Sequence, residues 1–281
     1  KRQEDMPDGR VKHIVQNITD PDIVPYIPDG IGNSTDRQRI PAVLIIPGGA
    51  FRRLVYNFEG EDVAKWLNSM GIAAFVLECR LPSDEHDNAE DVPLIDAMRA
   101  MRVIRGRAQE FGIDEAKIGV MGFSAGGFMA ALLSTAYESD VYADYKYKDE
   151  YDKLSARPDF AVCSYPVISI DDCIEAGKRY MSEEQVLERI SDSKAKILHK
   201  YNPDKLVRPD MPPVFICETD DDRTTLSENS VGFYMAARKA GVSAELHIFR
   251  TGGHGYGCGD DFAQTGAVSY THLTLPTSDL V

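Results

Sequence analysis

The sequence predicts an α/β protein with a mostly parallel central sheet and helices on both faces. Apolar strand-like runs alternate with amphipathic stretches along the chain, as expected when helices connect parallel strands and cover the sheet. The chain has 281 residues, of which 43% are hydrophobic, so it can bury one substantial core. We therefore expect a single domain over residues 1–267, with small cap-like inserts at about 137–157 and 171–210.

Each expected element follows from its local pattern. Short apolar runs indicate buried strands, and longer stretches with apolar residues on one side indicate helices. In chain order, the main ones are a strand at 41–46, a helix at 92–112, a strand at 117–121, a helix at 128–133, a strand at 213–217, a helix at 226–241 and a strand at 244–249. Within the second insert, residues 183–190 and 193–201 look helical.

The junction between the strand at 117–121 and the helix that follows it carries the pattern Gly-x-Ser-x-Gly. Ser124 stands at its centre, between Gly122 and Gly126. A strand, this pattern and a helix in succession are typical of a nucleophile elbow, a strained turn that lifts the serine hydroxyl out of the sheet. The two glycines are expected because a Cβ atom at either position would collide across the tight turn. The sequence therefore predicts Ser124 as a nucleophile.

A serine hydroxyl needs a base to take its proton, and the base needs an acid to orient it. His254 lies in a glycine-rich loop after the strand at 244–249, whereas His247 lies inside that strand and reads as a sheet-face residue. Three further histidines, His13, His86 and His199, lie in polar surroundings and are expected at the surface. We therefore predict His254 as the base.

The acid is expected in the run Asp220, Asp221 and Asp222, because it follows the strand at 213–217. The carboxyl ends of parallel strands border the crevice in which open α/β sheets bind their ligands. We favour Asp221, with Asp222 second and Asp220 third. Spacing alone does not decide among the three, and the other two are expected in a solvated acidic loop.

An oxyanion pocket is the third component that such chemistry requires. One donor is expected to be the backbone N–H of Ala125, directly after the nucleophile, and the other comes from a loop after an earlier strand. Here the strand at 41–46 is followed by Pro-Gly-Gly-Ala-Phe. Gly49 and Ala50 are therefore the candidate donors of that loop.

With these residues identified, the chain resembles the acetyl-xylan and feruloyl esterase-like branch of the α/β-hydrolases. The likeness covers roughly residues 11–260. The stretches that carry it are 47–51, 59–61, 64–69, 71–77, 122–127, 157–160, 165–169, 228–230 and 253–255. The resemblance implies an α/β-hydrolase fold, a triad of Ser124, Asp221 and His254, and hydrolysis of short acyl esters, acetyl above all, on plant polysaccharide.

Two departures from the family pattern affect these expectations. Family members usually have three glycines where this chain has Gly48, Gly49 and Ala50, so the extra methyl group is expected to narrow the acyl pocket. The turn that holds the acid is unusually charged, since Arg223 follows the three aspartates. The assignment of Asp221 rests on the resemblance and on its place after the strand.

The composition of the chain argues against several classes of binding partner. A net charge of −14 argues against nucleic acid, because binding phosphates needs clustered Lys and Arg. We expect no membrane span, since no stretch reaches the roughly 18 apolar residues required. Neither a zinc-like spacing nor a phosphate-binding glycine loop is present, so we expect no cofactor and no metal. The expected partner is a small-molecule or polysaccharide ester, and the oligomeric state is left open.

The cysteines and the two ends of the chain indicate the cellular compartment of the protein. Cys79, Cys163 and Cys217 sit in strand patterns and are expected as buried free thiols, which favours a reducing compartment. The chain starts without methionine, so secretion stays open. Residues 268–277 match the translation of a widely used transposase sequencing adapter. We therefore expect 268–281 to be non-native and the helix that would close the fold to be missing.

Two other functions compete with the ester hydrolase. A peptidase of the same fold would use the same triad on amides, but peptidases of this type usually add a large propeller or an acidic amine-binding helix. A non-catalytic binding protein on the same scaffold usually lacks a triad member, and none is visibly lost here. Five tyrosines near the first insert suit stacking on sugar rings, although covering the sheet edge is the simpler role for them.

Overall fold

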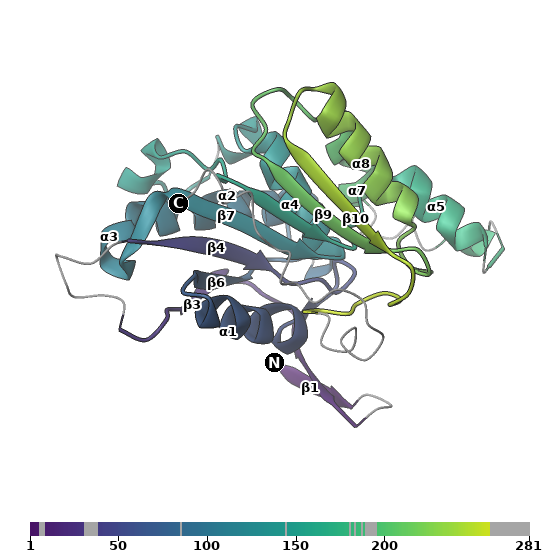
Figure 1. The fold of residues 1–281 in the computed structure, drawn as a ribbon, viewed down its shortest axis with the longest axis horizontal. Coiled ribbons are helices and arrows are strands. Elements are labelled where there is room, and N and C mark those ends of the chain that lie inside the picture. Colours follow the sequence, from purple (N-terminus) through teal and green to yellow (C-terminus); the bar gives the residue numbers. More distant parts are fainter. Residues whose placement is uncertain are drawn as a thin grey trace.

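The computed structural model describes residues 1–5, 9–30, 39–84, 86–143, 145–179, 181–182, 184–186, 188 and 196–258 (Figure 1). The tail expected to be non-native, at 268–281, and the closing helix expected after His254 lie outside these residues. The same holds for half of the residues of the helix expected at 183–190.

The central sheet contains seven of the described strands, in the order β10-β9-β8-β7-β4-β6-β3. Strand β3 pairs antiparallel with β6 at one edge, and the other pairings are parallel. The strands are β3 (Asp22–Tyr26), β4 (Ile40–Ile46), β6 (Ala73–Glu78), β7 (Ile113–Phe123), β8 (Ala161–Ser164), β9 (Val214–Thr219) and β10 (Ala244–Phe249). A smaller antiparallel sheet is formed by β1 (Arg2–Asp5), β2 (Val11–Val15) and β5 (Leu54–Val55).

Helices cover both faces of the central sheet. In Figure 1, α1 (Asp62–Ser69) lies in front of the sheet, whereas α2 (Val92–Gly106) and α4 (Ala125–Ala136) lie behind it and pack on each other. Helix α8 (Ser227–Lys239) packs on β9 and β10. The remaining helical elements are η1 (Asn57–Glu61), η2 (Pro82–Asp84), α3 (Ala108–Phe111), η3 (Asp140–Tyr142), η4 (Glu150–Lys153), α5 (Ile170–Lys178), α7 (Lys196–Lys200) and η6 (Pro203–Lys205).

The order of the strands determines where a site can form. From β4 the chain crosses through α1 to β6 on one side, and from β7 it crosses through α4 to β8 on the other side. Neighbouring strands whose connections leave in opposite directions form a topological switch point, with a crevice at their carboxyl ends. Right-handed crossovers in opposite directions also place α1 and α4 on opposite faces. The crevice between the ends of β4 and β7 is therefore the expected location of the site.

The elements predicted from the pattern agree with the structure apart from their ends. The strand expected at 244–249 is β10, and the helix expected at 226–241 is α8, shorter by a few residues at its ends. The helix expected at 92–112 is divided, because α2 ends at Gly106 and the short α3 follows. Gly112 then ends α3 with a φ of +67°, a conformation that glycine adopts without strain. Cys79, Cys163 and Cys217 are buried and form no disulfide among the described residues, as predicted.

The first insert lies against helix α2. The segments η3 and η4 pack on α2, and the guanidinium carbon of Arg102 lies 4.1 Å from the ring centroid of Tyr142. Tyr142 also stacks on Tyr145, with 5.0 Å between the ring centroids. Tyr142, Tyr145 and Tyr151 therefore pack against α2, whereas Tyr137 contacts Arg208 and Tyr147 is exposed. None of these five tyrosines lines the pocket that contains Ser124.

Candidate active site

Ser124 occupies the sharp turn between β7 and α4. Its backbone has φ +53° and ψ −118°, a conformation that costs a non-glycine residue free energy and that clusters at functional sites. The turn is anchored by its neighbours, since Ser124 N–H donates to the carbonyl of Ser164 at 3.0 Å and Val167 N–H donates to the carbonyl of Ser124 at 3.3 Å. The surrounding backbone therefore holds the strained residue in place.

The glycines of the motif are required sterically, as the sequence predicts. A Cβ atom on Gly122 would lie 2.0 Å from the carbonyl oxygen of Gly126, and one on Gly126 would lie 2.0 Å from the carbonyl oxygen of Ile46. Both contacts are with backbone atoms, which cannot rotate away as the end of a side chain does. Gly122 therefore permits the tight turn from β7 into α4, and Gly126 permits the close approach of α4 to the end of β4.

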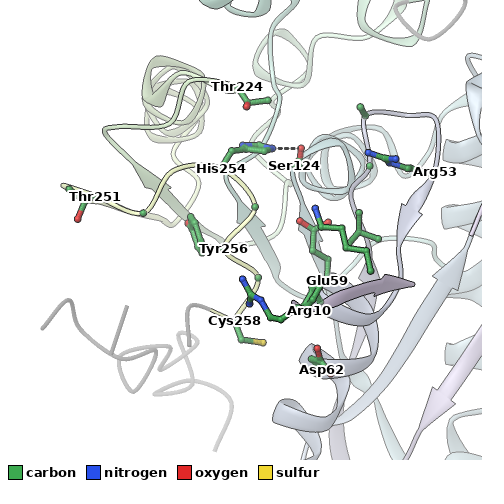
Figure 2. Close-up of a pocket in the computed structure, with 18 residues that line it drawn as sticks. Arg10, Arg53, Glu59, Asp62, Ser124, Thr224, Thr251, His254, Tyr256 and Cys258 are labelled. Atoms are coloured by element: carbon green, nitrogen blue, oxygen red, sulfur yellow. Dashed lines mark hydrogen bonds between the residues drawn. The ribbon is translucent and has the colours of Figure 1, made fainter. Parts of the chain in front are cut away.

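His254 reaches Ser124 from the loop after β10. Its Nε2 atom lies 2.8 Å from Oγ of Ser124 (Figure 2). The imidazole packs edge-on against Tyr165, with 5.1 Å between ring centroids. The loop is tied to β9, because the hydroxyl of Thr219 donates to the carbonyl of Gly253 at 2.9 Å. The two predicted residues therefore come together as a nucleophile and a base do.

The structure corrects the choice of the acid. Nδ1 of His254 lies 2.6 Å from Oδ2 of Asp222, the second-ranked candidate. The carboxylate of Asp221 points instead at the backbone, and its Oδ1 accepts from Gly252 N–H at 2.9 Å and from Gly253 N–H at 2.8 Å. The turn after β9 buries Asp222 and leaves Asp220 and Asp221 exposed. Asp221 thus holds the loop that carries the histidine, but it does not contact the imidazole.

Hydrogen bonds keep Asp222 ionised despite its burial. Burial raises its pKa, but the bond with His254 and the N–H groups of Thr224 and Thr225 outweigh that effect and leave the pKa below its ordinary value. Thr224 N–H donates to Oδ1 at 2.7 Å and Thr225 N–H donates at 3.0 Å. The Thr225 hydroxyl donates to Oδ2 at 2.9 Å. An aspartate that accepts from the N–H two residues on forms an Asx turn, as Asp222 does with Thr224.

The loop after β4 lies beside the serine, as predicted for an oxyanion loop. Ile46 pairs with Gly122, so the residues that follow each of them are neighbours. A Cβ atom on Gly48 would lie 3.0 Å from Cβ of Ser124. Gly49, Ala50 and Phe51 all have positive φ, and Val55 N–H donates to the carbonyl of Gly48 at 2.9 Å. The loop is thus a tight, anchored turn.

The three candidate oxyanion residues surround Ser124. Gly49 and Ala50 line the same pocket as Ser124 and His254. Ala125 is the first residue of α4, where helix N–H groups lack intrahelical acceptors and favour negative charge. The arrangement can therefore supply backbone donors from two directions to an oxygen next to Ser124.

The pocket has a volume of about 650 Å³. Figure 2 shows Ser124 and His254 at its centre, with Glu59 and Arg53 on one side and Tyr256 on the other. Its lining also includes Arg10, Lys12 and Asp62. The space is large enough for a sugar ester or a similar small molecule.

Two buried polar residues of this region, Glu59 and Tyr165, received no role from the sequence. Glu59 accepts a hydrogen bond from Gly48 N–H at 2.8 Å and another from the Tyr165 hydroxyl at 2.9 Å. Both residues belong to stretches that carry the family resemblance, but neither forms a local pattern that would assign it a role.

Among the residues that the structure describes, no cluster of His, Cys, Asp or Glu could hold a metal ion. The described helices also include none long and apolar enough to cross a membrane.

Comparison with known proteins places the chain in a family. Residues 31–236 match the BD-FAE family. The chain is 31% identical to an acetylxylan esterase of Xylanibacter ruminicola over 79% of this chain and 42% of that protein. It is also 31% identical to an endo-1,4-beta-xylanase B of Butyrivibrio fibrisolvens over 80% of this chain and 34% of that protein. The chain thus spans less than half the length of these curated relatives.

Solved structures agree with this assignment. The acetyl ester-xyloside bifunctional hydrolase of Caldicellulosiruptor lactoaceticus is 34% identical, with a TM-score of 0.68 over 89% of this chain and 90% of that one. The carboxylesterase Cest-2923 of Lactobacillus plantarum is 22% identical, with a TM-score of 0.70 over 95% and 90% of the two chains, which is a likeness of fold. The chain belongs to the BD-FAE family of α/β-hydrolases.

Proposed function

We propose that this protein is a serine carboxylesterase that removes short acyl groups, with acetyl preferred, from plant polysaccharide. The observation that carries the proposal is the continuous hydrogen-bonded series from Ser124 through His254 to Asp222. The substrate class is supported by the relatives, which include an acetylxylan esterase and an acetyl ester-xyloside bifunctional hydrolase.

In the proposed reaction, Oγ of Ser124 attacks the ester carbonyl while Nε2 of His254 takes the hydroxyl proton. Asp222 holds the imidazole in the tautomer with its proton on Nδ1 and stabilises the imidazolium that forms. The N–H groups of Gly49, Ala50 and Ala125 stabilise the negative oxygen of the tetrahedral intermediate.

The second half of the reaction uses the same groups in reverse. His254 gives its proton to the oxygen of the departing alcohol. The acyl group stays bonded to Oγ of Ser124. Water then loses a proton to His254 and attacks the acyl-enzyme, and the acid is released as Oγ of Ser124 recovers its proton.

Hydrolysis of an aryl acetate by the wild-type protein and by Ser124→Ala tests the mechanism. By analogy with a serine protease, loss of the nucleophile is expected to lower kcat by about 10⁶-fold. Unchanged hydrolysis by the variant would reject the mechanism.

The substrate is tested separately. Release of acetate from acetylated xylan, beside hydrolysis of butyrate esters and aminoacyl anilides, distinguishes an esterase from a peptidase of the same fold. Labelling of Ser124 by a fluorophosphonate distinguishes both from a binding protein, which would stay unlabelled.

A further inference from the structure

A series of buried hydrogen bonds joins the oxyanion loop to the loop that carries His254. Gly48 N–H donates to Oε2 of Glu59 at 2.8 Å, and the Tyr165 hydroxyl donates to Oε1 of Glu59 at 2.9 Å. The Tyr165 oxygen in turn accepts from Gly257 N–H at 3.1 Å. Two side chains therefore connect backbone atoms that lie on the two sides of Ser124.

The participants come from four separate segments of the chain. Gly48 follows β4, Glu59 lies in η1, Tyr165 follows β8 and Gly257 follows β10. All four segments meet at the carboxyl edge of the sheet, beside the switch point. Glu59 and Tyr165 therefore link these four segments by hydrogen bonds.

The ring of Tyr165 adds packing to these hydrogen bonds. It contacts His254 edge-on at 5.1 Å and Tyr256 edge-on at 4.4 Å between ring centroids. Tyr165 is fully buried, and its φ of +38° is unusual for a bulky residue. Strain of this kind persists only when the surroundings force it, and it concentrates at functional sites.

Glu59 is a costly residue for this position. Its side chain is 5% exposed, and burial raises its pKa although the Tyr165 hydroxyl and Gly48 N–H oppose the effect. Burying a carboxyl group costs free energy, and at Glu59 the two directed hydrogen bonds from Gly48 and Tyr165 offset that cost.

We propose that Glu59 and Tyr165 are positioning residues that hold the oxyanion loop and the His254 loop at the separation the reaction requires. The inference rests on the proposed esterase function. Gly48 and Tyr165 engage both oxygens of Glu59. Glu59 and Tyr165 therefore act on the reaction through the backbone of the oxyanion loop and the imidazole of His254. Oxyanion donors must lie within about 2.7–3.1 Å of the developing charge, and a misplacement of about 1 Å costs about 100-fold in rate.

The experiment compares Tyr165→Phe and Glu59→Gln with the wild type. Tyr165→Phe keeps the ring contacts and removes the hydroxyl, so kcat for an aryl acetate is expected to fall by about 10- to 100-fold while KM changes little. Affinity for a trifluoromethyl ketone, which forms a tetrahedral adduct, is expected to fall with kcat/KM. Glu59→Gln retains an acceptor for Gly48 and a polar contact with Tyr165, and should keep more activity than Glu59→Ala.

Tyr201→Phe is the matched control. Tyr201 is also buried, and its hydroxyl donates to Oδ1 of Asp91 at 2.5 Å, away from the residues that line the pocket. A purely structural role predicts similar losses of thermal stability and of activity in Tyr165→Phe and Tyr201→Phe. Positioning predicts the loss of kcat in Tyr165→Phe alone, measured well below the melting temperature of each protein.

The rate of fluorophosphonate labelling separates this proposal from the proposed function. A wild-type protein that is labelled but hydrolyses no ester overturns the esterase assignment, and the labelling rates of the variants still test the pair. A wild-type protein that neither is labelled nor hydrolyses esters overturns both. Equal kcat and equal labelling in wild type and Tyr165→Phe overturns the positioning role alone.

Discussion

Oδ2 of Asp222 lies 2.6 Å from Nδ1 of His254, and the adjacent Asp221 binds the backbone of the same loop instead. The two neighbouring carboxylates thus contact one loop in different ways. One meets the imidazole, and the other meets the N–H groups of Gly252 and Gly253.

Substitution of the two aspartates is expected to separate these roles. Asp222→Asn should lower kcat by about 10⁴-fold, because an amide favours the wrong tautomer of the imidazole. Asp221→Asn retains an acceptor for Gly252 and Gly253, so a loss below about tenfold is expected, in line with one weakened hydrogen bond. Steady-state hydrolysis of an aryl acetate measures both. A larger loss in Asp221→Asn than in Asp222→Asn would contradict the geometry.

Gly126→Ala is expected to prevent the native fold or to destabilise it severely. The new Cβ atom would lie 2.0 Å from the carbonyl oxygen of Ile46, and the nearest atoms belong to the backbone. Gly232→Ala is the control, because nothing lies within 4 Å of a Cβ atom there and its helix α8 gains up to about 1 kcal/mol from alanine. Thermal unfolding should show a large fall in the first variant and an equal or higher midpoint in the second. Similar midpoints would contradict the close packing of β4 against α4.

Glu218 predicts a dependence of stability on pH. Burial, with a smaller contribution from the nearby Asp222, raises the pKa of Glu218 to about 9 from an ordinary 4.5. Between these values the unfolded chain releases the proton and the folded protein keeps it. The contribution of Glu218 to the free energy of unfolding should therefore be highest below about pH 4.5. It should fall by up to about 1.4 kcal/mol per pH unit as the pH rises toward 9.

Glu218→Gln isolates this contribution, because glutamine does not titrate and still offers an acceptor to Thr219 N–H, which donates to the carboxyl group at 3.0 Å. Urea unfolding at pH 5 and pH 8 should show the variant gaining stability relative to the wild type at the higher pH. A constant difference between the two proteins at both pH values would show that Glu218 does not titrate in this way.

Ala50→Gly is expected to broaden the acyl specificity. Ala50 has a φ of +57° and lines the pocket beside Ser124. Removing its methyl group makes room for a longer acyl chain, and one methylene group in a pocket alters kcat/KM by about tenfold or more. The ratio of kcat/KM for butyrate and acetate esters should rise, with the acetate value as the internal reference. An unchanged ratio would show that this methyl group does not limit the acyl pocket.

The fold was predictable from the sequence because its signals are local. Buried strands such as β4 and β10 are short apolar runs, and the elbow at Ser124 follows from a steric rule about two flanking glycines. His254 was distinguishable from His247 because one follows a strand and the other lies within it. Each of these inferences needs only a few neighbouring residues.

The acid and the positioning pair depend on information that is not local. Whether Asp221 or Asp222 faces inward is decided by how the turn after β9 packs on the loop after β10. Glu59 and Tyr165 interact across a large part of the chain, and neither shows a pattern in its own segment. Their roles follow from the meeting of segments in space, which the sequence of either segment does not contain.

The glycine turns before β6 and β10 lie at the amino edge of the sheet, opposite the end that bears Ser124. Gly71 and Gly241 have φ near +80°, and nothing lies within 4 Å of a Cβ atom at either one. A carrier bead or reporter dye attached at these turns would face away from the pocket mouth. The molecule can thus be immobilised through the amino edge of the sheet, with the pocket at the opposite edge.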